Sequence, residues 1–289
     1  MVIFMNPDLL QYIEQSMPTL SKSQRRIGRY ICTHYDKAAY MTAAKLGSIA
    51  GVSESTVVRF ANELGYDGYP ALQAALRELI RTRLTALQRI EITNERIGDA
   101  DILTTVLNSD IDKIRYTLET IDRGSFQRAV DAILHAKTIY VAGARSSASL
   151  SSFLAFNLNL IFDNVRNVQA YGGSEIFEQL IHIGEGDVIL GISFPRYSKR
   201  IINAVQYAKS NQAQVIAITD SASSPLAPHA DVLLTAKTDM VSYVDSLVAP
   251  LSIINALIVA ISRSRQSELD SIFERLEKIW RDYDVYVKS

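Results

Sequence analysis

The amino-acid sequence predicts two domains of different class: an all-α N-terminal domain followed by an α/β domain with a doubly wound parallel sheet. Up to about Arg123, apolar residues recur at helical spacings of three and four, without an alternating strand. From Thr138 onward, short continuous apolar runs alternate with helical patterns or loops, which is typical of βαβ units. The charge divides at about the same place. Residues 1–90 hold 11 basic and 7 acidic residues, a net charge of +4, whereas the remaining residues hold 19 basic and 24 acidic residues, a net charge of −5.

Composition excludes several classes of protein. The 289 residues are 48% hydrophobic, which excludes a disordered chain. The one cysteine, Cys32, excludes a disulfide framework and a cysteine-built zinc site. The first ten residues lack the basic region and the length of a secretory signal, and the best apolar run, 244–261, is interrupted by Asp245, Pro250 and Asn255. We therefore expect a cytoplasmic protein.

The stretch from Ala43 to Phe60 predicts two short helices joined by a tight turn. Gly51 suits the left-handed end of the first helix, and Ser53 is the expected N-cap of the second. The second helix directs four apolar residues inward: Val57, Phe60, Ala61 and Leu64. Such a pair is a helix-turn-helix, whose second helix enters the major groove of DNA.

The outward-facing residues of this unit are the candidate DNA contacts. Ser55 and Thr56 are expected to reach bases or phosphate, and Arg59 to neutralise the DNA backbone or read a guanine. Basic residues of the preceding helix would add phosphate contacts. The candidates are Ser53, Ser55, Thr56, Arg59 and Asn62, with Lys22, Arg25, Arg26 and Arg29 before them. The same pattern also fits a helical hairpin with a solvated basic face.

Four segments carry a resemblance to a known family: SKSQRRI at 21–27, MTAA at 41–44, GVSESTVVRF at 51–60 and LGYDGYP at 64–70. Over residues 5–83 they resemble the N-terminal domain of the RpiR/MurR family of bacterial transcriptional regulators. The resemblance implies operator binding and control of carbohydrate metabolism genes. Within the last segment, Gly68 predicts a stop and Pro70 the start of a long helix to about Arg89. Residues 90–109 are expected to form the linker end of a long helix.

The second half predicts a buried parallel sheet, with apolar runs at 139–142, 188–192, 215–218 and 232–234 and a weaker one at 165–168. Ligands of doubly wound sheets bind outside the carboxyl ends of the strands. The first strand is followed by Arg145, Ser146 and Ser147, and the third by Ser193, Arg196 and Ser198. Hydroxyls, free amides at a helix start and an arginine predict a phosphate or carboxylate site. Alternatively, these serines are ordinary helix caps.

Residues 125–265 resemble the sugar isomerase (SIS) domain that follows the DNA-binding domain in the RpiR/MurR family. The resemblance implies a phosphosugar effector held by serine and threonine hydroxyls, with Ser147 matching the serine of the first G-x-G-x-S loop. Ser193 and Ser198 match the outer positions of the second loop, S-x-S-G-x-T. The chain departs from this pattern, since Arg145 replaces a glycine and Pro195-Arg196 replaces Ser-Gly. We expect Arg145 and Arg196 to hold the phosphate or carboxylate instead.

SIS domains also occur in isomerases and a lyase, so a sugar-phosphate isomerase or lyase is the alternative function. Its general base would be Glu175, ahead of Glu178 and His182. Glu175 is also a candidate ligand-binding residue. The absence of a dinucleotide fingerprint, a Walker motif and metal-ligand spacing predicts no cofactor and no metal.

We expect four parts: a DNA-binding domain (1–83), a helical linker and dimerisation region (84–124), a SIS domain (125–265) and a C-terminal helical extension (266–289). The extension carries an apolar stripe of Leu276, Ile279, Trp280 and Tyr283. This stripe is expected to pack on the sheet domain or on a second subunit. We predict a homodimer or homotetramer joined through SIS–SIS contacts and residues 101–122.

Overall fold

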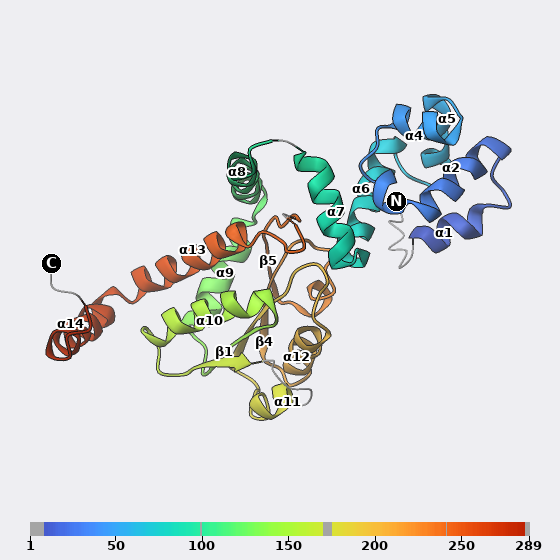
Figure 1. Ribbon diagram of the computed structural model, residues 1–289. Helices are drawn as coiled ribbons and strands as arrows, with labels where there is room; N and C mark the ends of the chain where they lie inside the picture. Colours follow the sequence, from blue (N-terminus) through green and yellow to red (C-terminus); the bar gives the residue numbers. More distant parts are fainter. Residues whose placement is uncertain (1–8, 99, 170–174, 241, 287–289) are drawn as a thin grey trace. The chain divides into compact units, whose positions relative to one another are not determined.

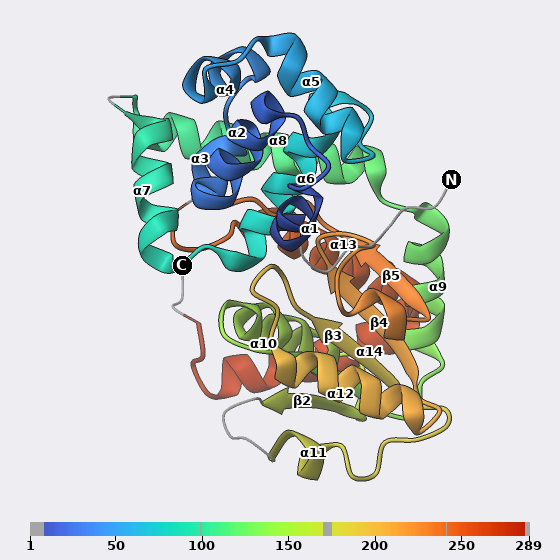
Figure 2. The ribbon, with the colours of Figure 1, turned by 90° about the vertical axis from the view of Figure 1, so that its right-hand side faces the viewer.

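The computed structural model describes residues 9–98, 100–169, 175–240 and 242–286. The chain divides into two compact units, Met1–Glu91 (unit 1) and Ile92–Ser289 (unit 2). Figures 1 and 2 show a helical unit 1 and an α/β unit 2. The predicted fold class, helical first and doubly wound α/β second, is confirmed.

Unit 1 is built entirely of helices in its described residues. The helices are α1 (Leu9–Ser16), α2 (Lys22–Thr33), α3 (Tyr35–Ala38), α4 (Ala43–Ala50), α5 (Glu54–Glu63) and α6 (Gly68–Arg83), with α7 (Ala86–Ile97) crossing the unit boundary. Helical spacing brings one apolar face of each longer helix into a common core. Fully buried members of this core include Ile13, Ile27, Ile31, Leu46, Phe60, Leu72 and Leu76.

The predicted long helix from Pro70 to Arg89 is wrong. Helix α6 begins at Gly68 and ends at Arg83, and α7 begins at Ala86. The break is a capping box: the Gln88 amide N–H donates to the Thr85 hydroxyl oxygen, and the Thr85 amide N–H donates to the Gln88 side-chain oxygen. The expected linker helix over 90–109 is also interrupted, because Gly98 is left-handed (φ 53°) and Asp101 caps the next helix.

Unit 2 contains all five predicted strands, paired in parallel in the order β2-β1-β3-β4-β5. The strands are β1 (Ile139–Gly143), β2 (Val165–Gln169), β3 (Val188–Ile192), β4 (Gln214–Thr219) and β5 (Val232–Thr235). Its helices are α8 (Ile102–Thr120), α9 (Arg123–Leu134), α10 (Ser146–Asn159), α11 (Glu175–Gln179), α12 (Lys199–Ser210), α13 (Val248–Ser264) and α14 (Gln266–Asp282), with the short 3-10 turn η1 (Ala227–His229).

Helices cover both faces of the sheet, as Figures 1 and 2 show. Alternate side chains of one strand enter different cores. Ile139 and Val141 of β1 join the core under α9, α10 and α13, whereas Tyr140 and Ala142 join the core under α11 and α12. Burial on both faces explains the continuous apolar runs of β1, β3 and β4. The edge strand β2, of which only Val168 is buried, is less apolar, with Arg166 and Asn167.

Helix α8 is held to the body of unit 2 by polar contacts as well as apolar ones. The buried Lys113 ammonium donates to the Ser109 hydroxyl at 2.7 Å and to the Asp110 carboxylate at 3.3 Å. Asp110 also accepts from the Ser246 hydroxyl, which lies in the segment after β5. In the same segment, the Lys237 amide N–H donates to the Thr117 hydroxyl at 2.9 Å. These bonds attach α8 to the segment that leaves the carboxyl end of β5.

Helix α14 extends away from the sheet. It leaves α13 at a bend of 99°, and Leu269 is its one buried residue. The expectation that its apolar stripe packs on the sheet domain is therefore wrong, and the alternative, a second subunit, stays a prediction. Among the described residues no single helix has the length and hydropathy to cross a membrane; α13 and α14 pass that test only as a bent pair.

Tyr69 joins α6 to the segment before α4, and this contact generates a prediction about stability. Its hydroxyl donates toward the Met41 carbonyl at 2.9 Å and lies 3.2 Å from the Ala38 carbonyl, and burial raises its pKa to about 12. Tyr69→Phe is expected to lower the unfolding free energy by about 1 kcal/mol, measured by urea denaturation. Gln73 still donates to the Met41 carbonyl, which keeps the loss small.

The same residue gives a pH dependence. Tyr69 has a pKa of about 12 in the folded protein and about 10 in the unfolded chain. Its contribution to the free energy of unfolding is therefore complete below pH 10 and falls as the pH rises towards 12. Tyr69→Phe should remove this decrease in the free energy of unfolding between pH 10 and pH 12, whereas Tyr283→Phe, at an exposed position, should not. Equal alkaline profiles for Tyr69→Phe and the parent would contradict the assignment.

Candidate functional site

The helix-turn-helix of unit 1 is formed by α4, a tight turn and α5. Gly51 ends α4 in the left-handed conformation predicted for it (φ 65°, ψ 41°). Gly47 permits the close approach of the turn, because a Cβ there would lie 2.9 Å from the Val52 carbonyl oxygen. Val57, Phe60, Ala61 and Leu64 are buried as predicted. Val52, which follows Gly51 in the turn, is half-buried.

Three hydroxyls gather at the start of α5. Ser53 occupies the N-cap, but its hydroxyl makes no bond to a helix amide, so the predicted capping bond is wrong. Instead the Ser53 hydroxyl lies 2.9 Å from that of Ser55 and 2.8 Å from that of Thr56. The Arg59 Nε donates to the Ser55 carbonyl at 3.3 Å, one turn earlier. Ser55 and Arg59 are exposed, so the start of α5 presents hydroxyls and a guanidinium to solvent.

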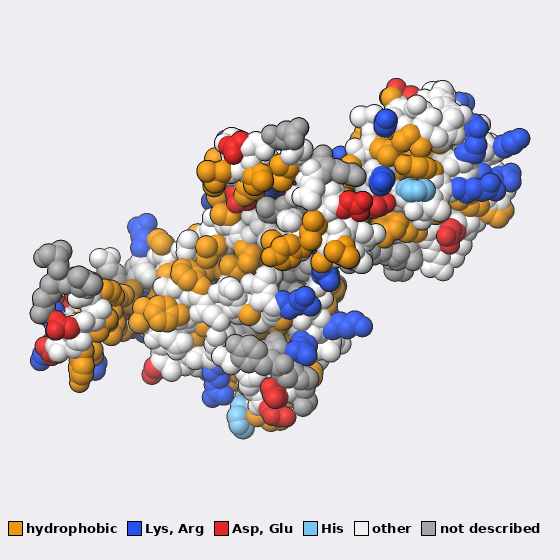
Figure 3. All heavy atoms as spheres, in the orientation of Figure 1, with side chains coloured by type: hydrophobic (Ala, Val, Ile, Leu, Met, Phe, Trp, Pro, Cys, Tyr) orange, Lys and Arg blue, Asp and Glu red, His pale blue; other side chains and the backbone are white. Residues whose placement is uncertain are grey.

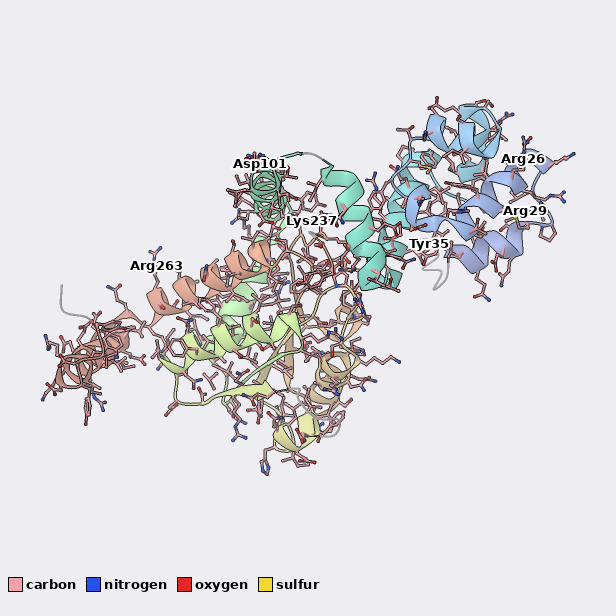
Figure 4. The ribbon with its side chains drawn as sticks, in the orientation of Figure 1. Arg26, Arg29, Tyr35, Asp101, Lys237 and Arg263 are labelled. Carbon is pink, nitrogen blue, oxygen red and sulfur yellow. The ribbon has the colours of Figure 1, made fainter. Side chains whose placement is uncertain are left out.

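The basic residues of α2 have different local partners. Arg26 donates to the Gly51 carbonyl and thereby ties α2 to the helix-turn-helix turn, and Arg25 donates to the Leu20 carbonyl at 2.8 Å. Lys22 and Arg29 are exposed. Figure 3 shows Lys and Arg side chains gathered on the face of unit 1 that carries α2, and Figure 4 labels Arg26 and Arg29 there. The structure therefore brings the predicted α2 cations together on one face.

Asn62 has a local structural role. Its side-chain oxygen accepts from the Gly68 amide N–H at 2.9 Å, which closes the turn between α5 and α6. The residue is exposed, so its amide group still faces solvent.

Three loops of unit 2 meet at the carboxyl edge of the sheet. The strand register pairs Gly143 of β1 with Ile192 of β3, and Ile192 with Ile218 of β4. The residues that follow these strands therefore start at the same level of the sheet. In a sheet of order 2-1-3-4-5 the ligand crevice opens between β1 and β3, where the strand order reverses.

The loop after β1 brings the first turn of α10 against the strand end. A Cβ on Gly143 would lie 2.4 Å from the Ser147 carbonyl oxygen, so no larger residue fits there. Ser147 is buried and Ser146 is exposed in this first turn. A small hollow beside the loop is lined by Arg145, Ser152, Asn167 and Gln169, among others.

The loops after β3 and β4 are joined by hydroxyl groups. The buried Ser193 hydroxyl accepts from the Ser198 amide N–H at 3.2 Å. The Thr219 hydroxyl donates to the Ser193 carbonyl at 2.8 Å and lies 2.8 Å from the Ser224 hydroxyl. The Tyr197 hydroxyl donates to the Asp220 carboxylate at 2.7 Å. Ser198 is the N-cap of α12 by position, without a side-chain capping bond.

Arg145 and Arg196 share an unusual backbone. Both have positive φ (58° and 64°), and both are exposed. Arg145 combines φ 58° with ψ −125°, which is a conformation that glycine adopts at little cost and other residues avoid. The two arginines thus occupy glycine-like backbone positions while extending guanidinium groups from the carboxyl edge of the sheet.

The candidate base Glu175 begins α11, a helix of five residues, and is exposed. Gly172, Gly173 and Ser174, with which it forms a run in the sequence, lie outside the described residues. His182 and Glu178 are also exposed. Within the described residues, no group of three or more His, Cys, Asp or Glu side chains is arranged to hold a metal ion.

Sequence reasoning missed four residues that shape this edge: Tyr197, Thr219, Asp220 and Ser224. The signal for three of them was the polar run that follows the buried strand at 215–218. This run stands in the same position relative to its strand as the loops that contain Arg145 and Arg196. Thr219 is completely buried, so it orders the neighbouring loop rather than facing solvent.

Comparisons with known proteins agree with both units. The model of the helix-turn-helix domain of the rpiR family matches residues 7–82, and the SIS domain model matches residues 132–260. The transcriptional regulator HexR of Escherichia coli is 25% identical over 284 residues, covering 95% of each chain. HexR of Pseudomonas aeruginosa is 24% identical, covering 94% of this chain and 95% of its own.

Two solved structures share the fold. Vibrio vulnificus NanR, complexed with ManNAc-6P, has a TM-score of 0.58 at 22% identity, over 96% of this chain and 99% of its own. The sugar isomerase domain of an RpiR transcription factor from Sphaerobacter thermophilus has a TM-score of 0.58 at 27% identity, over 61% of this chain and 97% of its own. With an rpiR-type helix-turn-helix in unit 1 and a SIS domain in unit 2, the chain belongs to the RpiR family of DNA-binding transcriptional regulators.

Proposed function

We propose that unit 2 binds a phosphorylated sugar or a sugar acid at the carboxyl ends of β1, β3 and β4, and that this effector modulates operator binding by unit 1. The observation that carries the proposal is the pair of arginines held at positive φ on adjacent loops. Strained backbone of this kind concentrates at functional sites, where the surrounding fold maintains it. NanR, whose structure holds ManNAc-6P, supports the same ligand class.

The arginines act in place of a backbone cradle. In the glycine-containing form of such loops, main-chain amides approach the phosphate closely. Here Arg145 and Arg196 supply planar, permanently charged forks that bind phosphate or carboxylate oxygens through two parallel hydrogen bonds. Ser146 and Ser198 provide polar groups at the starts of α10 and α12, while buried Ser147 and Ser193 order the loops. Glu175 would face the sugar hydroxyls.

In unit 1, we assign base or phosphate contacts to Ser55, Thr56 and Arg59 at the start of α5. Lys22, Arg25, Arg26 and Arg29 add phosphate contacts, and Arg26 also fixes the turn through Gly51. Ser53 orients the two neighbouring hydroxyls, and the exposed amide of Asn62 completes the surface. We assign operator binding to residues 1–83, the linker and dimerisation to 84–124, effector binding to 125–265 and a helical extension to 266–289.

The regulator acts in the cytoplasm as a homodimer or homotetramer and controls carbohydrate metabolism genes. Helix-turn-helix dimers place their recognition helices about 34–36 Å apart on two half-sites. An effector changes DNA affinity only through its differential affinity for two arrangements of that assembly. Unit 2 is a sensor without turnover: relatives over 95% of the chain are named regulators, and a steady-state assay with aldose phosphates should detect no conversion. Any turnover would favour the isomerase alternative.

The first prediction from this proposal concerns DNA. Arg59→Ala should weaken the shift of DNA from the gene's own upstream region by about tenfold or more in a gel assay, since one lost base or phosphate contact costs roughly 1–3 kcal/mol. Effector binding should persist. Lys278→Ala, on the polar face of α14, is the matched control. Loss of both DNA and effector binding would indicate a damaged fold, and an unchanged shift would remove Arg59 from the interface.

The second prediction concerns the effector. Arg145→Ala and Arg196→Ala should each weaken binding of 6-phosphogluconate, glucose 6-phosphate or gluconate by about 10- to 100-fold in calorimetry, because a hydrogen bond to a charged group contributes about 1.5–3 kcal/mol. Arg166→Ala, which removes a guanidinium from over the Tyr140 ring, should leave affinity unchanged. Unchanged affinity in both loop variants would overturn the assignment.

The third prediction separates strain from charge. Arg145→Gly relieves the backbone, whereas Arg145→Ala keeps a Cβ at φ 58°. The glycine variant should therefore be more stable than the alanine variant by about 1 kcal/mol in calorimetric unfolding, although both lose the guanidinium. Equal melting temperatures would mean that the loop relaxes without strain.

A further inference from the structure

Helix α14 has a complete apolar stripe with little of its own chain against it. The stripe comprises Leu269, Ile272, Phe273, Leu276, Ile279, Trp280 and Tyr283. Only Leu269, in the first turn, is buried, and Arg265 fixes that turn by lying over the Phe162 ring and pairing with Glu268. Phe273 is 38% exposed, Ile279 46% and Tyr283 79%. In proteins most of the stability of a helix comes from packing of its apolar face rather than from helix propensity, so this stripe needs a partner.

Elsewhere on unit 2 lies an apolar groove of about 250 Å³. Its walls are Ile114, Thr117 and Leu118 of α8, Ile121 directly after that helix, and Arg123 and Phe126 of α9. Its floor is Ala249, Ser252, Ile253 and Ala256 of α13. Leu118, on the wall, is 58% exposed. The bonds from Asp110 and Thr117 to the segment after β5 fix the α8 wall in place. Figure 3 shows hydrophobic side chains over α13 and α14.

The chain's own α14 is poorly placed to enter its own groove. The groove floor lies in the N-terminal half of α13, whereas α14 leaves from the C-terminal end of α13 at 99° (Figure 1). Arg265 and buried Leu269 hold that departure. A second copy has no such constraint, and a two-fold exchange fills two grooves with two helices and closes the assembly.

Charge supports the same pairing. Asp270 and Glu277 lie seven residues apart along one border of the α14 stripe, and both are exposed. The groove has Arg123 at its rim, also exposed. A helix seated in the groove with this border towards Arg123 would bring Asp270 and Glu277 near its guanidinium.

We propose that α14 is an exchanged arm: in the dimer, each chain's α14 lies in the α8–α9–α13 groove of the other chain. This deepens the proposed oligomer by naming the contact, and it is independent of the effector assignment. The arm would lie against α8, the helix that follows α7 in the chain and is attached to the segment after β5.

The test uses Trp280, the one tryptophan of the chain. In the assembled protein its emission should be shifted to shorter wavelength, and dilution should shift it to longer wavelength in parallel with the fall in mass by light scattering. Leu118→Glu alters the groove without touching the arm, and it should shift the Trp280 emission to longer wavelength. Ser149→Glu, at an exposed position on α10, is the control. An emission unchanged by Leu118→Glu in a protein that remains dimeric would overturn the proposal.

Cross-linking identifies the partner directly. In a Cys32→Ser background, Leu118→Cys and Ile279→Cys variants are prepared separately, mixed, and oxidised. A disulfide-linked dimer should form in the mixture and in neither variant alone. A cross-link within one chain of the double variant, or no cross-link in a dimeric mixture, would refute the exchange. A monomeric mass for the parent protein would instead refute the proposed oligomer itself, so the two failures are distinguishable.

Discussion

The carboxyl edge of the sheet depends on one close approach, that of the first turn of α10 to Gly143. Because a Cβ at Gly143 would lie 2.4 Å from the Ser147 carbonyl oxygen, α10 can start directly at the strand end only if this residue is glycine. That start forces the chain to reverse within Ala144 and Arg145, and the reversal places Arg145 at positive φ. The position of the guanidinium, the burial of Ser147 and the packing of α10 on β1 all follow from it.

Most of the fold is predictable because its patterns are local. Continuous apolar runs identified four of the five strands and a weaker run identified β2, and the Gly51 turn identified the helix-turn-helix, since these signals depend on residues adjacent in the chain. The break between α6 and α7 was missed although its capping box is also local: Thr85 and Gln88 lie inside an otherwise helical apolar pattern, and the pattern masked them. The exposure of α14 was not predictable, because an apolar stripe indicates that a helix has a packing face but does not identify the surface against which that face packs.

The candidate sites were predicted in part for the same reason. Ser193, Ser198 and Arg196 follow a buried strand and could be selected by position alone. Thr219 and Tyr197 act through bonds to Ser193 and Asp220 from a different loop, and such bonds depend on strand register, which a single sequence does not specify. Likewise, Ser53 is at the N-cap as expected, but the choice of its hydroxyl between an amide and two neighbouring hydroxyls is a matter of side-chain geometry.

The interruptions around α7 bear on how operators can be read. A single helix from Gly68 into α8 would be a rod, and two rods in a dimer would impose one spacing and one helical phase on their DNA half-sites. The Thr85 capping box and the left-handed Gly98 interrupt that span, so the described residues form three separate helices, α6, α7 and α8. In the proposed homodimer, the separation of the two recognition helices would therefore not be set by the length and phase of one continuous helix.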